Sequence, residues 1–213
     1  MTFYQIVVII IRFVIRVFNG KPHIEGLEHL NEDTTYIIAG THRSLTDPFF
    51  VAAAVKSKPV AFMAKVSVFK FKPIAYILKK GYVFPVNRDK PSATSIKHAV
   101  KVLNETGYHL GIFPSGTRYS TEIKSGTAFI QKLSKKAIVP VAIQPPIGFW
   151  QFITRRRAKI AFGAPIPFDE AVKYDKEKLA EVDALIAKRF DQLDKQLDAN
   201  YVYIPKVKKE KKN

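Results

Sequence analysis

The sequence predicts an α/β fold in which a mixed, largely parallel sheet is flanked by helices, preceded by an amphipathic helix. Three observations predict it. Short apolar runs alternate with stretches of helical periodicity after residue 22, the length of 213 residues suits one ordinary domain, and the first 19 residues are strongly apolar with a few polar positions. We expect a helix over residues 1–19, one domain over 20–200, and a basic, disordered tail over 201–213.

The first 19 residues have the pattern of neither a spanning helix nor a signal peptide. Arg12 and Arg16 interrupt the apolar run before ~20 residues are reached, and no small-residue cleavage site follows. At ~100° per residue, Gln5 falls on the same narrow stripe as the two arginines. This pattern favours a helix that lies in a membrane interface and reaches lipid phosphates with its guanidinium groups. The alternative is a helix packed on its own domain with the stripe in water.

The rest of the chain contains six candidate strands and five candidate helices. The strands are residues 35–39, 60–64, 81–86, 109–113, 138–144 and 158–162. The helices are residues 48–56, 68–79, 93–105, 127–135 and about 176–197. The last helix has apolar residues three or four apart and charges elsewhere, which is typical of a helix that covers a sheet.

The charge and the absence of cysteine restrict the possible functions. The formal net charge is +17, and because residues 206–213 contribute +4, the rest of the chain still carries +13. Such a chain is attracted to polyanions, either an anionic membrane or nucleic acid. A chain without cysteine has no disulfides, thiolate catalysis or cysteine metal sites. No metal site is expected, because the histidines outside residues 41–48 show no ligand spacing.

The first candidate for chemistry is the segment THRSLTDP, residues 41–48, directly after the strand at 35–39. Its His42 and Asp47 are close enough in sequence for a tight loop to bring imidazole and carboxylate together. The carboxylate would then orient the ring and stabilise the imidazolium formed when His42 takes a proton. Asp47 followed by Pro48 also fits a helix N-cap, and the two roles are compatible.

A second set of candidates consists of cations that follow strands. Arg118 comes after the strand at 109–113 and a turn in PSGT, residues 114–117, where Ser115, Gly116 and Thr117 offer hydroxyl and backbone N–H groups for a phosphate cradle. Arg88 and Lys65 follow other strands in the same way. Three cations at strand ends indicate one anionic pocket, although such residues also occur as solvent-facing side chains.

Four segments together carry a family resemblance. HRSLTD, GYVFPVNR, FPSGTR and VPVAI, in this order and spacing, resemble the four sequence blocks of the glycerolipid acyltransferase family, and in particular its bacterial 1-acylglycerol-3-phosphate subgroup. The resemblance covers residues 26–167. It implies that His42 is a general base for the sn-2 hydroxyl of the acceptor and that Asp47 orients it.

The resemblance also implies roles for the other blocks. Lys65, Arg88 and Arg118 would hold the acceptor's phosphate, Gly116 would let the backbone approach, and Pro140 would help to shape the acyl pocket. The family usually has Glu where this chain has Ser115, which we expect to affect acceptor positioning or selectivity.

The expected reaction moves a fatty acyl chain from an acyl thioester, on acyl carrier protein or coenzyme A, to lysophosphatidic acid, giving phosphatidic acid. No other cofactor is expected. Another lysophospholipid, a lyso-ornithine lipid or glycerol-3-phosphate is the alternative acceptor, and a non-catalytic lipid-binding module is the alternative function. Nucleic-acid binding is not expected, because no helix-turn-helix, RNP or zinc signature is present.

Because the acceptor and the product both carry acyl chains that are costly to transfer into water, we expect a peripheral or monotopic enzyme at the cytoplasmic face of the membrane, with anionic lipids as partners. Residues 66–82 mix aromatic residues with lysines, which favours headgroup contact or an ordinary amphipathic helix. The run Arg155, Arg156, Arg157 after the aromatic residues at 149–152 is interpreted as a second anchoring patch or an exposed turn.

Overall fold

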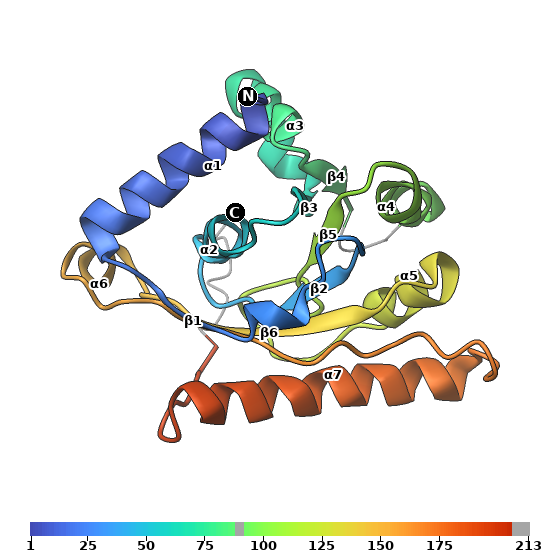
Figure 1. The fold of residues 1–213 in the computed structure, drawn as a ribbon. Helices are drawn as coiled ribbons and strands as arrows, with labels where there is room; N and C mark the ends of the chain where they lie inside the picture. The colour runs from blue at the N-terminus through green and yellow to red at the C-terminus, as the bar shows by residue number, and fades with distance from the viewer. Residues whose placement is uncertain (88–91, 206–213) are drawn as a thin grey trace, which may run out of the picture.

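The computed structural model describes residues 1–87 and 92–205, and in that part of the chain one sheet of seven strands forms the centre of the molecule (Figure 1). Its strand order is β1-β7-β6-β2-β5-β3-β4. All neighbouring strands are parallel except β6 and β7, which are antiparallel, so the predicted mixed and largely parallel sheet is confirmed. The strands are β1 (His23–Glu25), β2 (Ile37–Gly40), β3 (Val60–Lys65), β4 (Phe84–Val86), β5 (His109–Ile112), β6 (Ile138–Gln144) and β7 (Lys159–Phe162).

Helices cover both faces of this sheet (Figure 1). One face carries α1 (Phe3–Val14) and α2 (Asp47–Ala54), and the other carries α4 (Ala93–Glu105), α5 (Gly126–Ser134) and α7 (Lys176–Leu197). The short helices α3 (Lys72–Lys80) and α6 (Phe149–Ile153) lie near the two ends of α1 (Figure 1). A π-helical turn, Ile15–Asn19, follows α1 directly, and 3₁₀ turns occur at Leu27–His29 and Val66–Lys70.

Strand β2 shows how one sheet serves two cores. Ile38 packs with the residues of α1 and α2, whereas Ile37 and Ala39 pack with those of α4, α5 and α7. Because successive side chains of a strand point to opposite faces, both sets are buried. This is why the central strands read as continuous apolar runs in the sequence.

Several predicted elements differ from the structure at their ends. The helix predicted at 68–79 is divided into a 3₁₀ turn and α3, with Pro73 in the first turn of α3, because proline is tolerated there and not in a helix interior. The strand predicted at 81–86 begins only at Phe84, since Gly81 ends α3 and Tyr82 has φ 62°. Strand β1 was not predicted, because three residues are too few to show alternation.

The first helix differs from its prediction in how Arg12 is used. The Nε of Arg12 donates to the carbonyl oxygen of Ala53 at 2.9 Å, and its Nη2 donates to that of Val55 at 3.4 Å. Arg12 thus satisfies backbone carbonyls at the C-terminal end of α2, where a cation is also favoured by the helix dipole. The expectation that this guanidinium reaches outward is therefore wrong.

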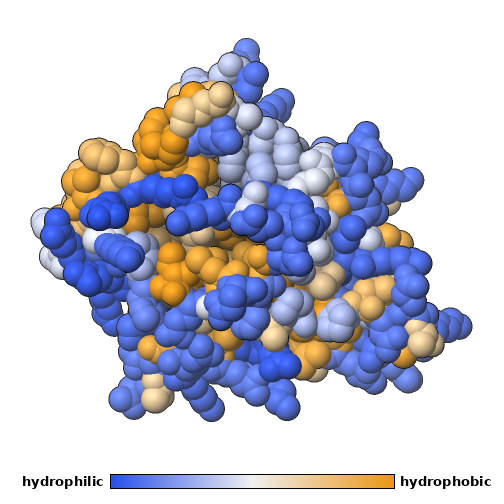
Figure 2. All heavy atoms as spheres, in the orientation of Figure 1, coloured by the Kyte–Doolittle hydropathy of each residue, from blue (hydrophilic) through white to orange (hydrophobic). Residues whose placement is uncertain are grey.

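The outward face of α1 is apolar instead. Its exposed side chains include Ile6, Ile9, Ile10 and Phe13, and Figure 2 shows hydrophobic residues gathered at the upper left, over α1. Within residues 1–87 and 92–205, no helix combines the length and the apolar character needed to cross a bilayer.

Candidate active site

The sheet brings the sequence blocks to one edge. Strands β2, β5, β3 and β4 are parallel neighbours, so their carboxyl ends lie at the same edge. His42 follows β2, the PSGT turn follows β5, and Lys65 ends β3. Arg88 follows β4 in sequence but lies outside the described residues.

Thr41 sets the direction in which the chain leaves β2. Its backbone N–H donates to the carbonyl of Val141, and its Oγ1 accepts a hydrogen bond from the backbone N–H of Ile143 at 2.9 Å. The side chain therefore continues the contact with β6 for one residue beyond the strand. These hydrogen bonds of Thr41 fix the position of the backbone at which the loop containing His42 begins.

His42 and Asp47 form a buried pair. The distance between Nδ1 of His42 and Oδ2 of Asp47 is 3.0 Å, and the two side chains are 8% and 0% exposed. The same carboxylate oxygen accepts the backbone N–H groups of Arg43 at 2.6 Å and Ser44 at 2.7 Å. Because an ionised carboxylate only accepts hydrogen bonds, Nδ1 of His42 carries the hydrogen and Nε2 is left as the basic nitrogen.

The N-cap interpretation of Asp47 is wrong in detail. Thr46 occupies the N-cap position, without a side-chain hydrogen bond, and Asp47 is the first residue of α2. Its carboxylate binds the loop rather than the first N–H groups of the helix. A negative charge is still favoured at this end of a helix by the aligned peptide dipoles.

An aromatic platform fixes the imidazole from the other side. The ring of Phe113 lies 4.4 Å from that of His42, with an interplanar angle of 22°, and Phe62 stacks on Phe113 in turn. Gly40 permits this approach, since a Cβ there would lie 3.0 Å from the Phe113 ring. The ring of His42 is thus held by a hydrogen bond and by stacking.

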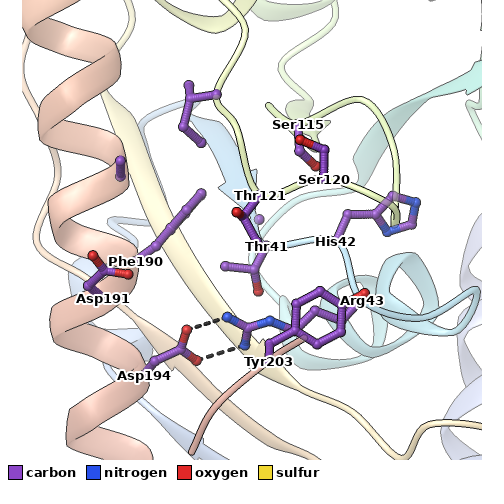
Figure 3. Close-up of a pocket in the computed structure, with 13 residues that line it drawn as sticks. Thr41, His42, Arg43, Ser115, Ser120, Thr121, Phe190, Asp191, Asp194 and Tyr203 are labelled. Carbon is purple, nitrogen blue, oxygen red and sulfur yellow. Dashed lines mark hydrogen bonds and ion pairs between the residues drawn. The ribbon is translucent and has the colours of Figure 1, made fainter. Parts of the chain in front are cut away.

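His42 lies where two cavities of different character meet. A polar pocket of about 220 Å³ is lined by His42 together with Thr41, Ser115, Ser120, Thr121 and Asp191, among others (Figure 3). An apolar cavity of about 430 Å³ is lined by His42, Phe113 and residues of α1, α2, α3 and β3. The imidazole can therefore act on a polar group of a ligand in one cavity while the apolar part of the same ligand occupies the other.

Arg43 is a residue of the site that sequence reasoning missed. Its side chain points away from His42 and toward α7 (Figure 3), where both terminal nitrogens bind the carboxylate of Asp194 and Nη1 also donates to the carbonyl of Ile143. Its guanidinium lies about 5 Å from the rings of Tyr201 and Tyr203. These contacts lock the loop that carries His42 to the last helix. Only the position of Arg43 beside His42 could have signalled it.

The PSGT turn contributes Ser115 to the lining of the polar pocket, and the loop that follows contributes Ser120 and Thr121. Ser115 is buried, and its Oγ donates to the carbonyl of Thr117 at 2.8 Å. Gly116 has φ +66°, a conformation that favours glycine, and its N–H donates to the carbonyl of Phe113 at 2.8 Å. Half-buried Arg118 lines a neighbouring cavity of about 460 Å³, together with Ser44 and Leu45.

Residues 201–205 were expected to belong to the disordered tail, but their tyrosines contact the folded domain near Arg43 and Arg118. The tail therefore begins later than residue 201. The hydroxyl of Tyr203 donates to the carbonyl of Arg118 at 2.8 Å. Burial raises the pKa of Tyr203, so the hydroxyl stays protonated and remains a donor. Residues 206–213 lie outside the described residues.

The predicted site residues Lys65, Arg118 and Pro140 do not line the pocket that contains Ser115. Lys65 is exposed at the end of β3 and borders the apolar cavity, whereas Arg118 borders a different one. Pro140 is buried inside β6, where its carbonyl accepts the N–H of Gly163 at 2.8 Å. The flanking residues Val139 and Val141 belong to the core under α1 and α2, so Pro140 points to the opposite face, and it is not among the described residues that line the apolar cavity.

Within the described part of the chain, no three histidine or acidic side chains cluster so as to hold a metal ion. The chemistry that the site offers is proton transfer by His42. A buried carboxylate supports it, and cations stand at the nearby loops.

Comparisons with known proteins agree with this picture. A family model described as Acyltransferase matches residues 21–144. A 1-acyl-sn-glycerol-3-phosphate acyltransferase of Streptococcus pneumoniae is 34% identical over 84% of this chain and 68% of its own length, and one of Bacillus subtilis is 34% identical over 87% and 94%. The crystal structure of a 1-acyl-sn-glycerophosphate acyltransferase of Thermotoga maritima superimposes with a TM-score of 0.68 at 19% identity, over 94% of this chain and 83% of that chain. At that identity, the superposition supports the fold.

Proposed function

This chain belongs to the acyltransferase family, and from that premise we propose that it transfers a fatty acyl chain from a thioester to the sn-2 hydroxyl of 1-acylglycerol-3-phosphate, giving phosphatidic acid. The observation that carries the proposal is the His42–Asp47 pair at the junction of a polar pocket and an apolar cavity. Lysophosphatidic acid itself combines a polar phosphorylated end with an apolar chain.

In the proposed reaction His42 acts as the general base. Its Nε2 takes the proton of the acceptor's hydroxyl as the oxygen attacks the carbonyl carbon of the thioester. A tetrahedral intermediate forms, the C–S bond breaks, and the departing thiolate takes the proton from the imidazolium. The acyl chain therefore passes directly to the acceptor, with no acyl-enzyme.

Asp47 makes this proton transfer favourable. As the imidazolium forms, its positive charge lies beside a carboxylate that is buried and already held by two backbone N–H groups. A charge pair of this kind is stronger away from bulk water, and it needs no rearrangement during the reaction.

The acceptor's phosphate is proposed to lie at the loop after β5. The guanidinium of Arg118 supplies donors there. Gly116 has no side chain, so it leaves room for the phosphate beside the turn. Ser115 uses its hydroxyl within the turn, so its effect on selectivity would come from the shape and neutrality of the pocket rather than from a charge. Lys65 and Arg88 are proposed to add positive charge at the neighbouring strand ends.

The apolar cavity under α1 and α3 is proposed to hold an acyl chain. Each CH₂ withdrawn from water contributes ~0.8 kcal/mol, so a cavity lined mainly by apolar side chains would bind the chain and leave its carboxyl end near His42. Insoluble lipids require work at a membrane surface, and we propose peripheral binding at the cytoplasmic face through anionic lipids. Acyl carrier protein or coenzyme A would carry the donor.

The test is an assay of the full chain with lysophosphatidic acid and each thioester, with phosphatidic acid measured by mass spectrometry. We expect product with wild type and at least about a thousandfold less with His42→Ala, because the base and its orienting carboxylate act together. His23→Ala is the matched control, since the His23 side chain is 59% exposed and pairs with Glu25 on β1. It should retain wild-type activity.

The same assay includes glycerol-3-phosphate, a lyso-ornithine lipid and a lysophosphatidylcholine as acceptors. Preference for one of these over lysophosphatidic acid would refute the proposed acceptor while leaving the reaction type intact. Equal activity of wild type and His42→Ala on every acceptor would refute the mechanism.

A further inference from the structure

The short helix α6 exposes two large aromatic side chains. Phe149 is 70% and Trp150 is 73% exposed, and their rings meet edge to face with centroids 5.8 Å apart. Aromatic rings of this size are usually buried, and an exposed pair is typical of a surface that binds something else. The proposed chemistry does not use either ring.

This helix is held rigidly beside the end of the first helix. The buried side-chain amide of Asn19 donates to the carbonyls of Phe152 and Arg156, and its Oδ1 accepts the N–H of Ala158 at 3.2 Å. Arg155 adds a hydrogen bond from Nη2 to the carbonyl of Val17. Five residues of helix would not hold their place alone, so these bonds fix where the aromatic pair stands.

The π-helical turn next to α6 is apolar on its exposed side as well. Val17 is 42% and Phe18 is 49% exposed, and both belong to the turn to which Asn19 ties α6. We call Val17, Phe18, Phe149 and Trp150 the α6 lip. It extends the apolar outer face of α1 around the end of that helix.

Positive charge directly follows this apolar surface. Arg155, Arg156 and Arg157 come after α6 and are all exposed. Exposed phenylalanine and tryptophan followed in the chain by exposed arginines are a combination favoured at a membrane interface, where the rings enter the lipid and guanidinium groups bind phosphates. A neutral surface or a nucleic acid would not satisfy both halves of this arrangement.

The lip also adjoins the site. Phe149 and Phe152 line the same cavity as Arg118, Ser44 and Leu45. A lipid that leaves the bilayer at α6 would therefore meet an aromatic wall on one side and the guanidinium of Arg118 on the other.

We propose that the α6 lip is a membrane anchor for anionic phospholipid, with Trp150 and Phe149 inserted among the acyl chains and Arg155–Arg157 on headgroup phosphates. The anchor places the cavity of Arg118 at the bilayer surface. This last consequence rests on the proposed function, whereas insertion of the lip does not.

Trp150 makes the test direct, because it is the one tryptophan in the sequence. The full chain is mixed with phosphatidylglycerol vesicles, and the tryptophan emission is measured with quenchers placed either in water or, as brominated lipid, in the bilayer. We expect a blue shift, protection from the aqueous quencher and strong quenching by brominated lipid. Phosphatidylcholine vesicles should produce a much smaller change.

Paired variants then test the aromatic residues of the lip and the neighbouring arginines separately, by vesicle sedimentation. Phe149→Ser with Trp150→Ser should weaken binding about tenfold, since two large apolar side chains lose their burial. The control pair Leu133→Ser and Val172→Ser changes exposed apolar residues elsewhere and should bind like wild type.

The charge is tested in the same way. Arg156→Ala with Arg157→Ala should weaken binding to phosphatidylglycerol more than Lys101→Ala with Lys135→Ala, which removes the same charge from side chains that are more than 60% exposed on α4 and at the end of α5.

The proposal is overturned if Trp150 stays open to the aqueous quencher on vesicle-bound protein, or if the chain does not bind anionic vesicles. A lip that binds a soluble protein and leaves Trp150 outside the lipid would overturn it equally. An inserted Trp150 in a chain without activity on lysophosphatidic acid would refute the proposed function and leave this inference standing.

Discussion

Replacing Asp47 with Asn tests how much the buried carboxylate contributes to catalysis. The side chain keeps its size, and its oxygen can still accept the N–H groups of Arg43 and Ser44, so the loop should keep its shape. What disappears is the negative charge whose Oδ2 lies 3.0 Å from Nδ1 of His42. The variant therefore isolates charge from geometry.

The expected loss follows from the distance. For charge centres about 4 Å apart and an effective dielectric constant of about 20, the attraction is about 4 kcal/mol. Each ~1.36 kcal/mol is a factor of ten in rate, so kcat should fall about a thousandfold. The assay is phosphatidic acid formation at saturating lysophosphatidic acid, with far-UV circular dichroism to show that the variant is folded.

Asp191→Asn is the matched control, since it removes an exposed carboxylate that lines the same pocket and makes no hydrogen bond or ion pair with His42. It should change kcat less than about threefold, because an exposed charge is screened by water. A folded Asp47→Asn variant with more than a tenth of wild-type kcat would refute the reasoning, as would an equal loss in Asp191→Asn.

Three further predictions concern stability. Burial lowers the pKa of His109 to about 4 from its usual 6.5, so between these pH values the folded state binds fewer protons than the unfolded chain. The free energy of unfolding should therefore fall by about 3 kcal/mol as the pH drops from 6.5 to about 4. Urea unfolding at a series of pH values measures this fall. Burial raises the pKa of Asp183 to about 6 from 3.8, so the ionised form is disfavoured in the fold, and Asp183→Asn should raise the thermal midpoint above pH 6 but not below 3.8. Gly111→Ala should destabilise by about 1–3 kcal/mol, because its Cβ would lie 2.3 Å from the ring of Phe62.

Each of these has its own control. The pH dependence should largely vanish in His109→Gln, and an unchanged slope there would exclude His109 as its source. A thermal midpoint of Asp183→Asn that stays above wild type even at pH 3.8 would mean that the gain does not come from ionisation. Gly126→Ala meets nothing within 4 Å, so an equal loss of stability in that variant would refute the steric explanation of Gly111.

Elements with a strong local pattern were predicted closely. The periodicity of the last helix predicted residues 176–197, and α7 spans Lys176–Leu197. The apolar run at 138–144 likewise coincides with β6. The helix α7 buries one face and the strand β6 buries both, so the spacing of apolar residues in the sequence follows directly from the geometry of each element. Strand β1 escaped prediction because its place depends on pairing with β7, more than 130 residues later.

The site was predicted in proportion to how local its contacts are. His42 and Asp47 lie in one loop, so their pairing follows from a short stretch of chain. Arg43 binds Asp194, 151 residues away, and the neighbouring sequence carries no sign of this partner. Whether Lys65 and Arg118 share a phosphate pocket was likewise not readable from their common position after strands, and in the structure they border separate cavities.

By itself, the sequence determined the order of most helices and strands, the imidazole and carboxylate that can move a proton, and an apolar beginning followed by a basic body. These properties depend on residues within a few positions of one another. Only the tertiary structure decided that Phe113 stacks on His42, that Arg12 turns inward to α2 and leaves the apolar face of α1 outside, and that α6 stands beside the end of that helix. Such contacts depend on which strands become neighbours in the sheet, and strand order is set by packing of the whole chain rather than by any local pattern.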